Sequence, residues 1–127
     1  MSQRLVRRIV PKAADYTVKY PMDAAGTEFT NRGATGTVIF TLPTPGRQLL
    51  GVSYRVRGVA DYTVTVAGAA AGDLLTKNDA AANSLSAQTS GEKIGALIEA
   101  VCEESAEGTF KWAIAGVAVG ITYTVAT

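Results

Sequence analysis

Apolar and polar residues alternate regularly between Gly33 and Ala67, and this alternation constrains the fold more than any other feature of the chain. Successive side chains of a β-strand point to opposite faces, so Val38, Phe40 and Leu42 share one face of a predicted strand. Proline follows directly at position 43, and proline cannot donate a hydrogen bond to a sheet. We therefore predict a strand that ends before this proline.

Two more strands are predicted in the same region, at residues 50–57 and 61–66. In the first, Tyr54 and Val56 share one face and Arg55 lies on the other. Both stretches have one apolar and one polar face, which is typical of strands with one side in water. Only a short glycine-containing segment separates them, so we predict that they form a hairpin.

Further strands are predicted along the rest of the chain, at residues 15–20, 27–30, 93–102, 110–114 and 119–125. Residues 68–90 are rich in Ala, Ser and Asn. A short helix at 73–85 is one interpretation, since Ala favours helices, but the leucines there make a poor apolar stripe. We predict a long irregular connection with one or two short strands, around Leu74 and Leu85.

Residues 93–102 fit two kinds of secondary structure. Their apolar residues recur at helical spacing and also at alternate positions, as a strand requires. Glu103 and Glu104 would stand at the C-terminus of such a helix, where the helix dipole disfavours negative charge. We therefore predict a strand.

Many short strands with frequent turns, in a chain of 127 residues, predict one all-β domain. We expect an antiparallel β-sandwich or jelly-roll-like barrel over residues 15–127, preceded by an extended basic N-terminal arm over residues 1–14. No acidic residue offsets the positive charge of this arm, which comes from Arg4, Arg7, Arg8 and Lys12. The arm is either a poorly ordered terminus or a segment that contacts an acidic neighbouring subunit through these side chains.

The charge and cysteine content exclude several classes of partner. Twelve basic and eleven acidic side chains nearly cancel, which predicts binding neither to nucleic acid nor to an anionic membrane. Arg55 and Arg57 share the face opposite Tyr54, so no base-stacking surface is predicted either. One cysteine cannot form an intrachain disulfide. We find no secretion signal or membrane-spanning stretch and expect a soluble protein whose partners are proteins.

Histidine is absent, and this argues against most enzyme mechanisms. Without it, catalytic sets of the Ser-His-Asp and Cys-His types and the usual zinc sites are excluded. Cys102 lies on an alternating apolar face and is predicted to be a small buried residue. We expect no enzymatic activity, no metal site and no cofactor.

Three other groups of residues could carry chemistry, and each also has a simpler structural interpretation. Paired carboxylates could act in glycoside hydrolysis, but a solvated strand end explains the same acidic group, which consists of Glu99, Glu103, Glu104 and Glu107. Asp73, Asn78 and Asp79 offer oxygens for calcium, but their spacing does not match an EF-hand loop. The glycine-rich residues 33–36 precede a strand and lack the Gly-Lys-Ser/Thr of a phosphate-binding loop.

Three stretches form a recognisable pattern when they are read together. They are Asp15-Tyr16-Thr17-Val18 with residues 23–31, then residues 33–43, and then Gly51-Val52-Ser53-Tyr54-Arg55-Val56 with residues 62–67. This pattern resembles small all-β structural domains of tailed-phage virions, in which a Thr-Leu-Pro strand end is followed by a Gly-x-x-Tyr strand and a Gly-Lys-Trp-like closing strand. The closing strand here is Gly108-Thr109-Phe110-Lys111-Trp112, which differs by two inserted residues.

This resemblance implies a capsid decoration (cement) protein. Such a protein would be made in the host cytoplasm, associate as a trimer, and bind the major capsid protein on the outside of the virion to stabilise it. The resemblance carries no catalytic residues to this chain. An alternative is a tail or head fibre domain, or an adhesin module that binds host-surface sugar through Trp112 and nearby tyrosines. Trp112 alternates in phase with Phe110 and Ile114, however, which predicts a core position.

Overall fold

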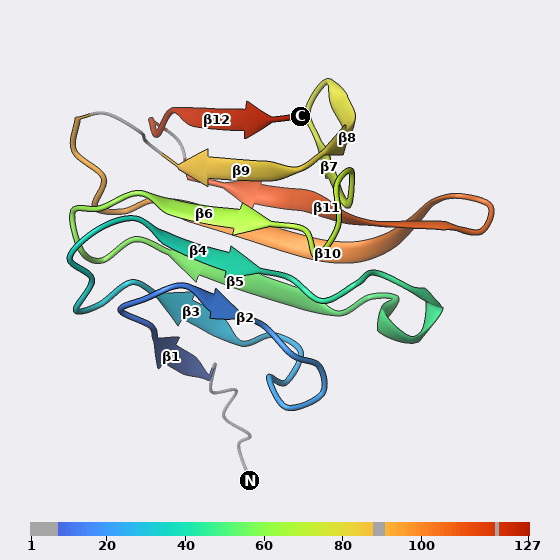
Figure 1. The fold of residues 1–127 in the computed structure, drawn as a ribbon, viewed down its shortest axis with the longest axis horizontal. Helices are drawn as coiled ribbons and strands as arrows, with labels where there is room; N and C mark the ends of the chain where they lie inside the picture. Colours follow the sequence, from blue (N-terminus) through green and yellow to red (C-terminus); the bar gives the residue numbers. More distant parts are fainter. Residues whose placement is uncertain (1–7, 88–90, 119) are drawn as a thin grey trace, which may run out of the picture.

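The computed structural model describes residues 8–87, 91–118 and 120–127, and these residues form two mixed β-sheets without any α-helix. The seven-stranded sheet has the order β1 (Ile9–Pro11), β3 (Glu28–Thr30), β5 (Ser53–Arg57), β10 (Leu97–Ala106), β11 (Thr109–Val117), β7 (Leu74–Thr76) and β8 (Asp79–Ala82). The five-stranded sheet has the order β12 (Tyr123–Ala126), β9 (Ser84–Ala87), β6 (Val64–Ala67), β4 (Val38–Thr41) and β2 (Tyr16–Thr17). In Figure 1 the strands of both sheets run roughly along the long axis of the molecule. The prediction of an all-β protein is confirmed.

The prediction that the strands are all antiparallel is wrong. Strand β5 runs parallel to β3, and β6 runs parallel to β4. The reason lies in the chain path, because β3, β4, β5 and β6 alternate between the two sheets. Each strand returns in the opposite sheet, so the next strand of the same sheet starts again in the original direction.

The predicted hairpin between residues 50–57 and 61–66 is also wrong, because β5 and β6 belong to different sheets. The connection between them is held by Asn31, which is fully buried. Its side-chain oxygen accepts hydrogen bonds from the backbone N–H groups of Val59 and Ala60, and its nitrogen donates to the carbonyls of Ala60 and Tyr62. These bonds replace the backbone pairing that a hairpin would have supplied.

Side chains from both sheets meet in one core. The predicted inner faces are confirmed, since Val38, Phe40 and Leu42 are buried, as are Tyr54 and Val56. The aromatic rings of Phe29 from β3 and Phe40 from β4 join the two layers, with centroids 5.5 Å apart. The layers therefore pack face to face in a sandwich-like arrangement.

The water-facing side predicted for residues 61–66 is wrong. Thr63 and Thr65 are buried. Strand β6 lies in the interior of its sheet between β4 and β9, and the hydroxyls of Thr65 and Ser86 share a hydrogen bond of 2.8 Å. Polar residues on the outer face of this sheet are thus satisfied by cross-strand contacts as well as by water.

Residues 93–102 form a strand, as predicted, although β10 starts later, at Leu97, and extends to Ala106. Alternate residues Ala96, Ile98, Ala100 and Cys102 are buried. The strand forms a long antiparallel hairpin with β11. This hairpin is the central pair of the larger sheet.

Short strands occur around Leu74 and Leu85, as predicted, and the alternative helix over residues 73–85 is absent. A third strand, β8, was not predicted. Its sequence is Asp-Ala-Ala-Ala, which shows no alternation of large apolar and polar residues. It pairs with β7 because Asn78, at φ 65°, turns the chain back between them.

Part of the predicted N-terminal arm lies in the larger sheet. Residues Ile9–Pro11 form β1, which pairs in parallel with β3. The remaining residues, 1–7, lie outside the described part of the chain. An extended arm before β1 therefore stays a prediction. No helix in the described part of the chain is long and apolar enough to span a membrane.

Candidate functional site

The four predicted arm contacts are only partly within the described residues. Arg4 and Arg7 lie outside them. The guanidinium of Arg8 donates a hydrogen bond of 3.3 Å to the carbonyl of Met22, and the ammonium of Lys12 lies 3.9 Å from the centroid of the Tyr16 ring. Both contacts hold the chain near β1, and the role of all four residues in binding a partner stays a prediction.

Glu99 and Glu103 do not form a pair of carboxylates suited to glycoside hydrolysis. Glu99 lies in the middle of β10 and accepts a hydrogen bond of 2.8 Å from Arg55. Glu103 is four residues further along the strand, roughly 13 Å away at the rise of a β-strand, beyond the carboxyl separations of these enzymes. Glu104 faces the other way and accepts a hydrogen bond from the backbone N–H of Gly108 in the hairpin turn. Glu107 is exposed in the same turn.

The carboxylates of Asp73 and Asp79, which were considered as calcium ligands, accept hydrogen bonds from nearby backbone groups. The carboxylate of Asp73 accepts a hydrogen bond from the backbone N–H of Ala70, and that of Asp79 accepts one from Ala81. Asp73 and Asp79 lie on either side of the short strand β7. Among the described residues there is no group of three or more acidic or cysteine side chains that could hold a metal ion. Residues 33–36 form the turn between β3 and β4.

Cys102 is a free, buried thiol, as predicted. It lies 3.7 Å from the carbonyl of Gly46. Burial raises the pKa of the Cys102 thiol. A raised pKa keeps the group in the unreactive thiol form at neutral pH.

The two arginines of β5 are neutralised by acidic neighbours. Arg55 pairs with Glu99 at 2.8 Å, and Arg57 pairs with Glu28 at 3.0 Å. The hydrogen bond that Arg55 donates to Glu99 raises the pKa of Arg55. Together these side chains form a charged ladder across β3, β5 and β10 on the outer face of the larger sheet.

Tyr54 and Trp112 are both in the core, on the opposite face from this ladder. Trp112 is completely buried, and its indole N–H donates a hydrogen bond of 2.7 Å to the carbonyl of Pro43. The hydroxyl of Tyr54 donates to the carbonyl of Asp23. The prediction that Trp112 is a core residue is confirmed, so its ring cannot stack on a sugar.

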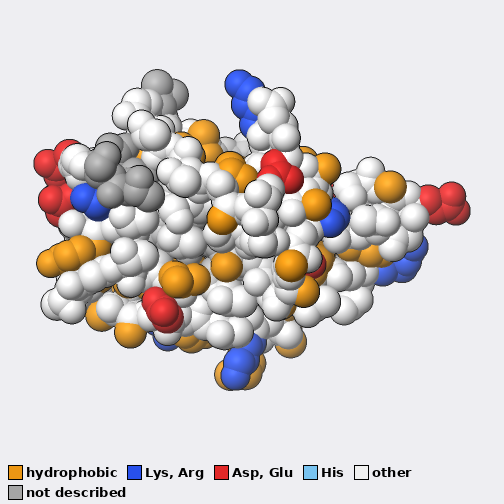
Figure 2. All heavy atoms as spheres, turned by 45° about the horizontal axis from the view of Figure 1, so that its top comes forward, with side chains coloured by type: hydrophobic (Ala, Val, Ile, Leu, Met, Phe, Trp, Pro, Cys, Tyr) orange, Lys and Arg blue, Asp and Glu red, His pale blue; other side chains and the backbone are white. Residues whose placement is uncertain are grey.

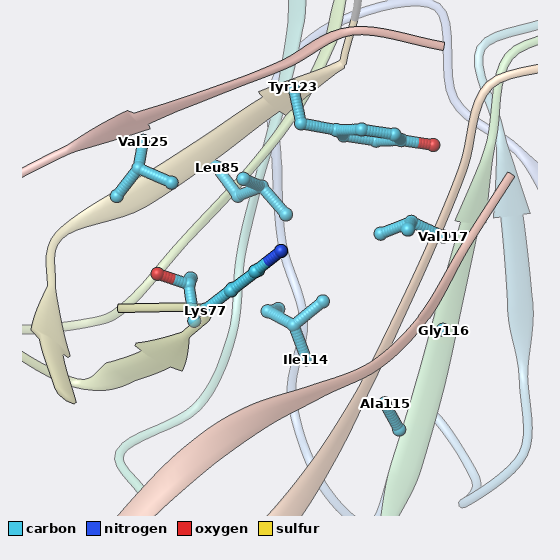
Figure 3. Close-up of a pocket in the computed structure, with 9 residues that line it drawn as sticks. Lys77, Leu85, Ile114, Ala115, Gly116, Val117, Tyr123 and Val125 are labelled. Atoms are coloured by element: carbon cyan, nitrogen blue, oxygen red, sulfur yellow. The ribbon is translucent and has the colours of Figure 1, made fainter. Parts of the chain in front are cut away.

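A groove between the two sheets, next to β12, is the most distinctive feature of the surface (Figure 3). Its volume is about 630 Å³. Most of its lining is apolar, and the side chains come from β7, β9, β11, β12 and the turn after β7. We call it the β12 groove, and define it by Thr76, Lys77, Leu85, Ile114, Ala115, Gly116, Val117, Tyr123 and Val125.

The groove is open because strand pairing in each sheet stops beside it. Strand β7 pairs with β11 only at Trp112 and Ala113, so the following residues of β11 are paired only with β10 among the described strands. Strand β12 is the edge of the smaller sheet and pairs only with β9. Two strand edges therefore border one apolar space. Val117 and Val125 remain 46% and 38% exposed at this place.

Two polar groups stand at the groove. Figure 3 shows the side chain of Lys77 extending toward Leu85 and Ile114, with its ammonium over the apolar lining. The Tyr123 hydroxyl lies at another end of the groove, where it donates to the carbonyl of Leu97 at 2.7 Å and accepts from the N–H of Ala118 at 3.0 Å. Tyr123 is thus fixed by the fold, whereas no ion pair joins Lys77 to an acidic residue in the described ranges.

Elsewhere on the same side of the molecule the surface is mixed. Figure 2 shows hydrophobic side chains scattered over the face turned forward, with charged side chains both at its two ends and between them. Scattered exposed apolar residues are normal for a folded protein. The gathering of apolar residues in the groove is the exception to this pattern.

The groove was not predicted from the sequence, although an uncharged stretch near the C-terminus contains most of its lining. Six of its nine lining residues lie within residues 112–127, a run without any charged side chain. An edge strand normally carries charges or proline. Comparison with known proteins adds no assignment, because no protein-family model matches the chain and no curated protein is significantly similar to it.

Proposed function

We propose that this protein is a structural protein of a tailed-phage virion that decorates and stabilises the outer surface of the capsid through contacts with the major capsid protein. The observation that carries the proposal is the β12 groove, an apolar space bordered by two strand edges that pair with no further strand among the described residues. Such a surface suits the uptake of a protein segment. A jelly-roll-like path, a trimer and a location on the virion, after synthesis in the host cytoplasm, belong to the same proposal.

The physical mechanism is preferential binding. A subunit that bridges neighbouring shell proteins binds the assembled shell and not the separated subunits. Each such contact shifts the equilibrium toward the assembled form by mass action. The shell then withstands more heat or internal pressure.

The basic N-terminal segment, residues 1–14, supplies a second contact in this proposal. Arg4, Arg7, Arg8 and Lys12 are its cationic residues. Long-range attraction to an acidic neighbouring subunit would speed association and would weaken as salt screens it. Deleting residues 1–7 removes two of the four charges and leaves β1 and its pairing with β3 in place.

Negative-stain microscopy of purified phage shells, with and without added protein, tests the proposal. We expect discrete knobs on the outer surface and a higher temperature of shell disruption. Deletion of residues 1–7 should weaken binding, more at low than at high salt, with an unchanged circular-dichroism spectrum. Shells that stay bare and equally heat-labile at saturating protein would refute the decoration role. Unchanged binding by the deletion variant would refute the arm contact alone.

The alternative of a fibre or adhesin domain that binds sugar has lost its main support. It relied on an accessible Trp112, which is completely buried. Tyr20 and Tyr62 are exposed but stand alone, without a second aromatic ring beside them among the ring contacts of the described residues. We therefore do not propose this function.

A further inference from the structure

We propose that the β12 groove binds an extended segment of a partner protein, which adds as a strand beside β12, places alternate apolar side chains between the sheets and sets an acidic side chain against Lys77. This inference rests on the proposed function only in that the partner is a protein. It goes further by stating how the segment pairs with β12 and the chemistry of the side chains that fit the groove.

The first argument comes from the edges of the two sheets. Strand β1 is a short edge that contains Pro11 and is flanked by Arg8 and Lys12, and β2 has only two residues. Strand β8 is an edge that begins with Asp79. Charge, proline and shortness all discourage the addition of another strand. Strand β12 has none of these protections in its sequence, Tyr-Thr-Val-Ala.

The second argument comes from the space beside this edge. A strand added next to β12 would point every second side chain toward β11 and β7, into the groove. The groove's volume, about 630 Å³, is within the range of specific binding pockets. Filling it would cover the exposed parts of Val117 and Val125 and remove apolar surface from water.

The third argument is the charge of Lys77. Lys77 is the cationic residue in the lining of the groove. The ammonium of Lys77 extends over the apolar lining and forms no ion pair within the described part of the chain. Lys77 is exposed in the free protein, and a bound segment would cover it, so that a carboxylate at this place gains more from the charge than it would in open water.

This charge decides between two possible occupants. A second copy of the chain could pair its own β12 with this edge, since uncharged strands are self-complementary. Strand β12 carries no acidic residue, however, so a copy would leave Lys77 unpaired. A different protein segment that alternates apolar residues with an acid fits the groove better.

A synthetic peptide provides the test. The probe is acetyl-Lys-Thr-Val-Thr-Val-Thr-Glu-Thr-amide with a fluorescent label, in which both valines and the glutamate fall on one face of a strand. Its twin has Gln in place of Glu. A third peptide carries N-methyl groups on the backbone and cannot pair as a strand. Fluorescence polarisation with the full-length protein measures the affinity of each.

We expect the Glu peptide to bind about threefold to tenfold more tightly than the Gln peptide, as for a partly buried ion pair. Lys77→Gln should remove this difference, and Lys19→Gln, which removes another exposed lysine, should preserve it. Val125→Lys should weaken both peptides roughly tenfold or more, because it places a charge on the apolar edge. Val59→Lys, at a valine of similar exposure away from the groove, should not.

Several outcomes would overturn the inference. They are equal affinity for the Glu and Gln peptides, undiminished binding of the N-methylated peptide, and full binding by Val125→Lys. Dissociation of a self-associated form by Val125→Lys, without peptide binding by the wild type, would identify a second copy as the occupant instead. The N-methylated peptide needs only the wild-type protein, so the test survives if a variant misfolds. Shells decorated by a protein that binds no peptide would reject this inference and leave the proposed function standing.

Discussion

The side-chain carboxamide of Asn31 binds both backbone groups of Ala60, accepting a hydrogen bond of 2.8 Å from its N–H and donating one of 3.2 Å to its carbonyl. Asn31 follows β3 in the larger sheet, and Ala60 lies in the crossing that leads to β6 in the smaller one. The pair therefore fixes the place where the chain changes sheets. Asn31 is fully buried, so its carboxamide depends on these bonds within the protein.

Replacement of Asn31 with Ala should destabilise the protein by about 2–4 kcal/mol, since it removes the four hydrogen bonds of a fully buried side chain. Asn83→Ala is the matched control, because among the described residues the Asn83 side-chain oxygen accepts a single hydrogen bond, from the backbone N–H of Gly72. We expect it to cost roughly 1 kcal/mol. Urea unfolding measures both. Equal effects would show that the Asn31 bonds do not hold the crossing.

The burial of Trp112 predicts a fluorescence result. Acrylamide should quench its emission weakly in the folded protein and strongly in urea, because the ring is inaccessible until the sheets separate. Trp112→Phe should reduce the free energy of unfolding by about 1–3 kcal/mol, as it leaves space in the core and an unpaired carbonyl at Pro43. Strong quenching under native conditions would contradict the position of this ring.

Stability should fall in alkaline solution because of Tyr54. Burial, reinforced by the charge of Asp23, raises the pKa of Tyr54 to about 12. The folded state thus holds this proton more tightly than the unfolded chain, whose tyrosines titrate near about 10. The resulting stabilisation is complete below about pH 10 and is lost as the pH rises toward about 12.

Unfolding free energies at about pH 8 and about pH 11 measure this effect, and Tyr54→Phe should show a smaller loss between them than the wild type. Tyr62→Phe removes an exposed phenol and is the matched control. A wild-type slope that Tyr54→Phe leaves intact would assign the alkaline loss to other groups.

The two arginines of β5 should differ in their contribution to stability. Arg57 pairs with Glu28, which is only 5% exposed, whereas both partners of the Arg55 and Glu99 pair are partly in water. Arg57→Gln should therefore cost roughly 1–3 kcal/mol, because it removes compensation from a buried carboxylate. Arg55→Gln should cost less than about 1 kcal/mol. Thermal unfolding of both variants compares them, and the reverse order would contradict this explanation.

The candidate site was harder to predict than the core. The positions of Cys102 and Trp112 in the interior followed from alternation, because a strand with one buried face repeats every two residues. The β12 groove joins residues from Thr76 to Val125 that no local pattern connects. It exists because β7 stops covering β11 after Ala113, which depends on how two distant strands meet.

Local alternation and turn residues were sufficient to establish that the chain forms strands, and which face of β4, β5 and β10 is buried. These properties depend on neighbours along the chain. Tertiary contacts alone decided that β5 and β6 enter different sheets, that many neighbouring strands run parallel, and that an apolar groove stays open at β12. A strand's pairing partner is chosen by long-range burial and hydrogen bonding, such as the Asn31 bonds to the crossing, and no period in the sequence records that choice.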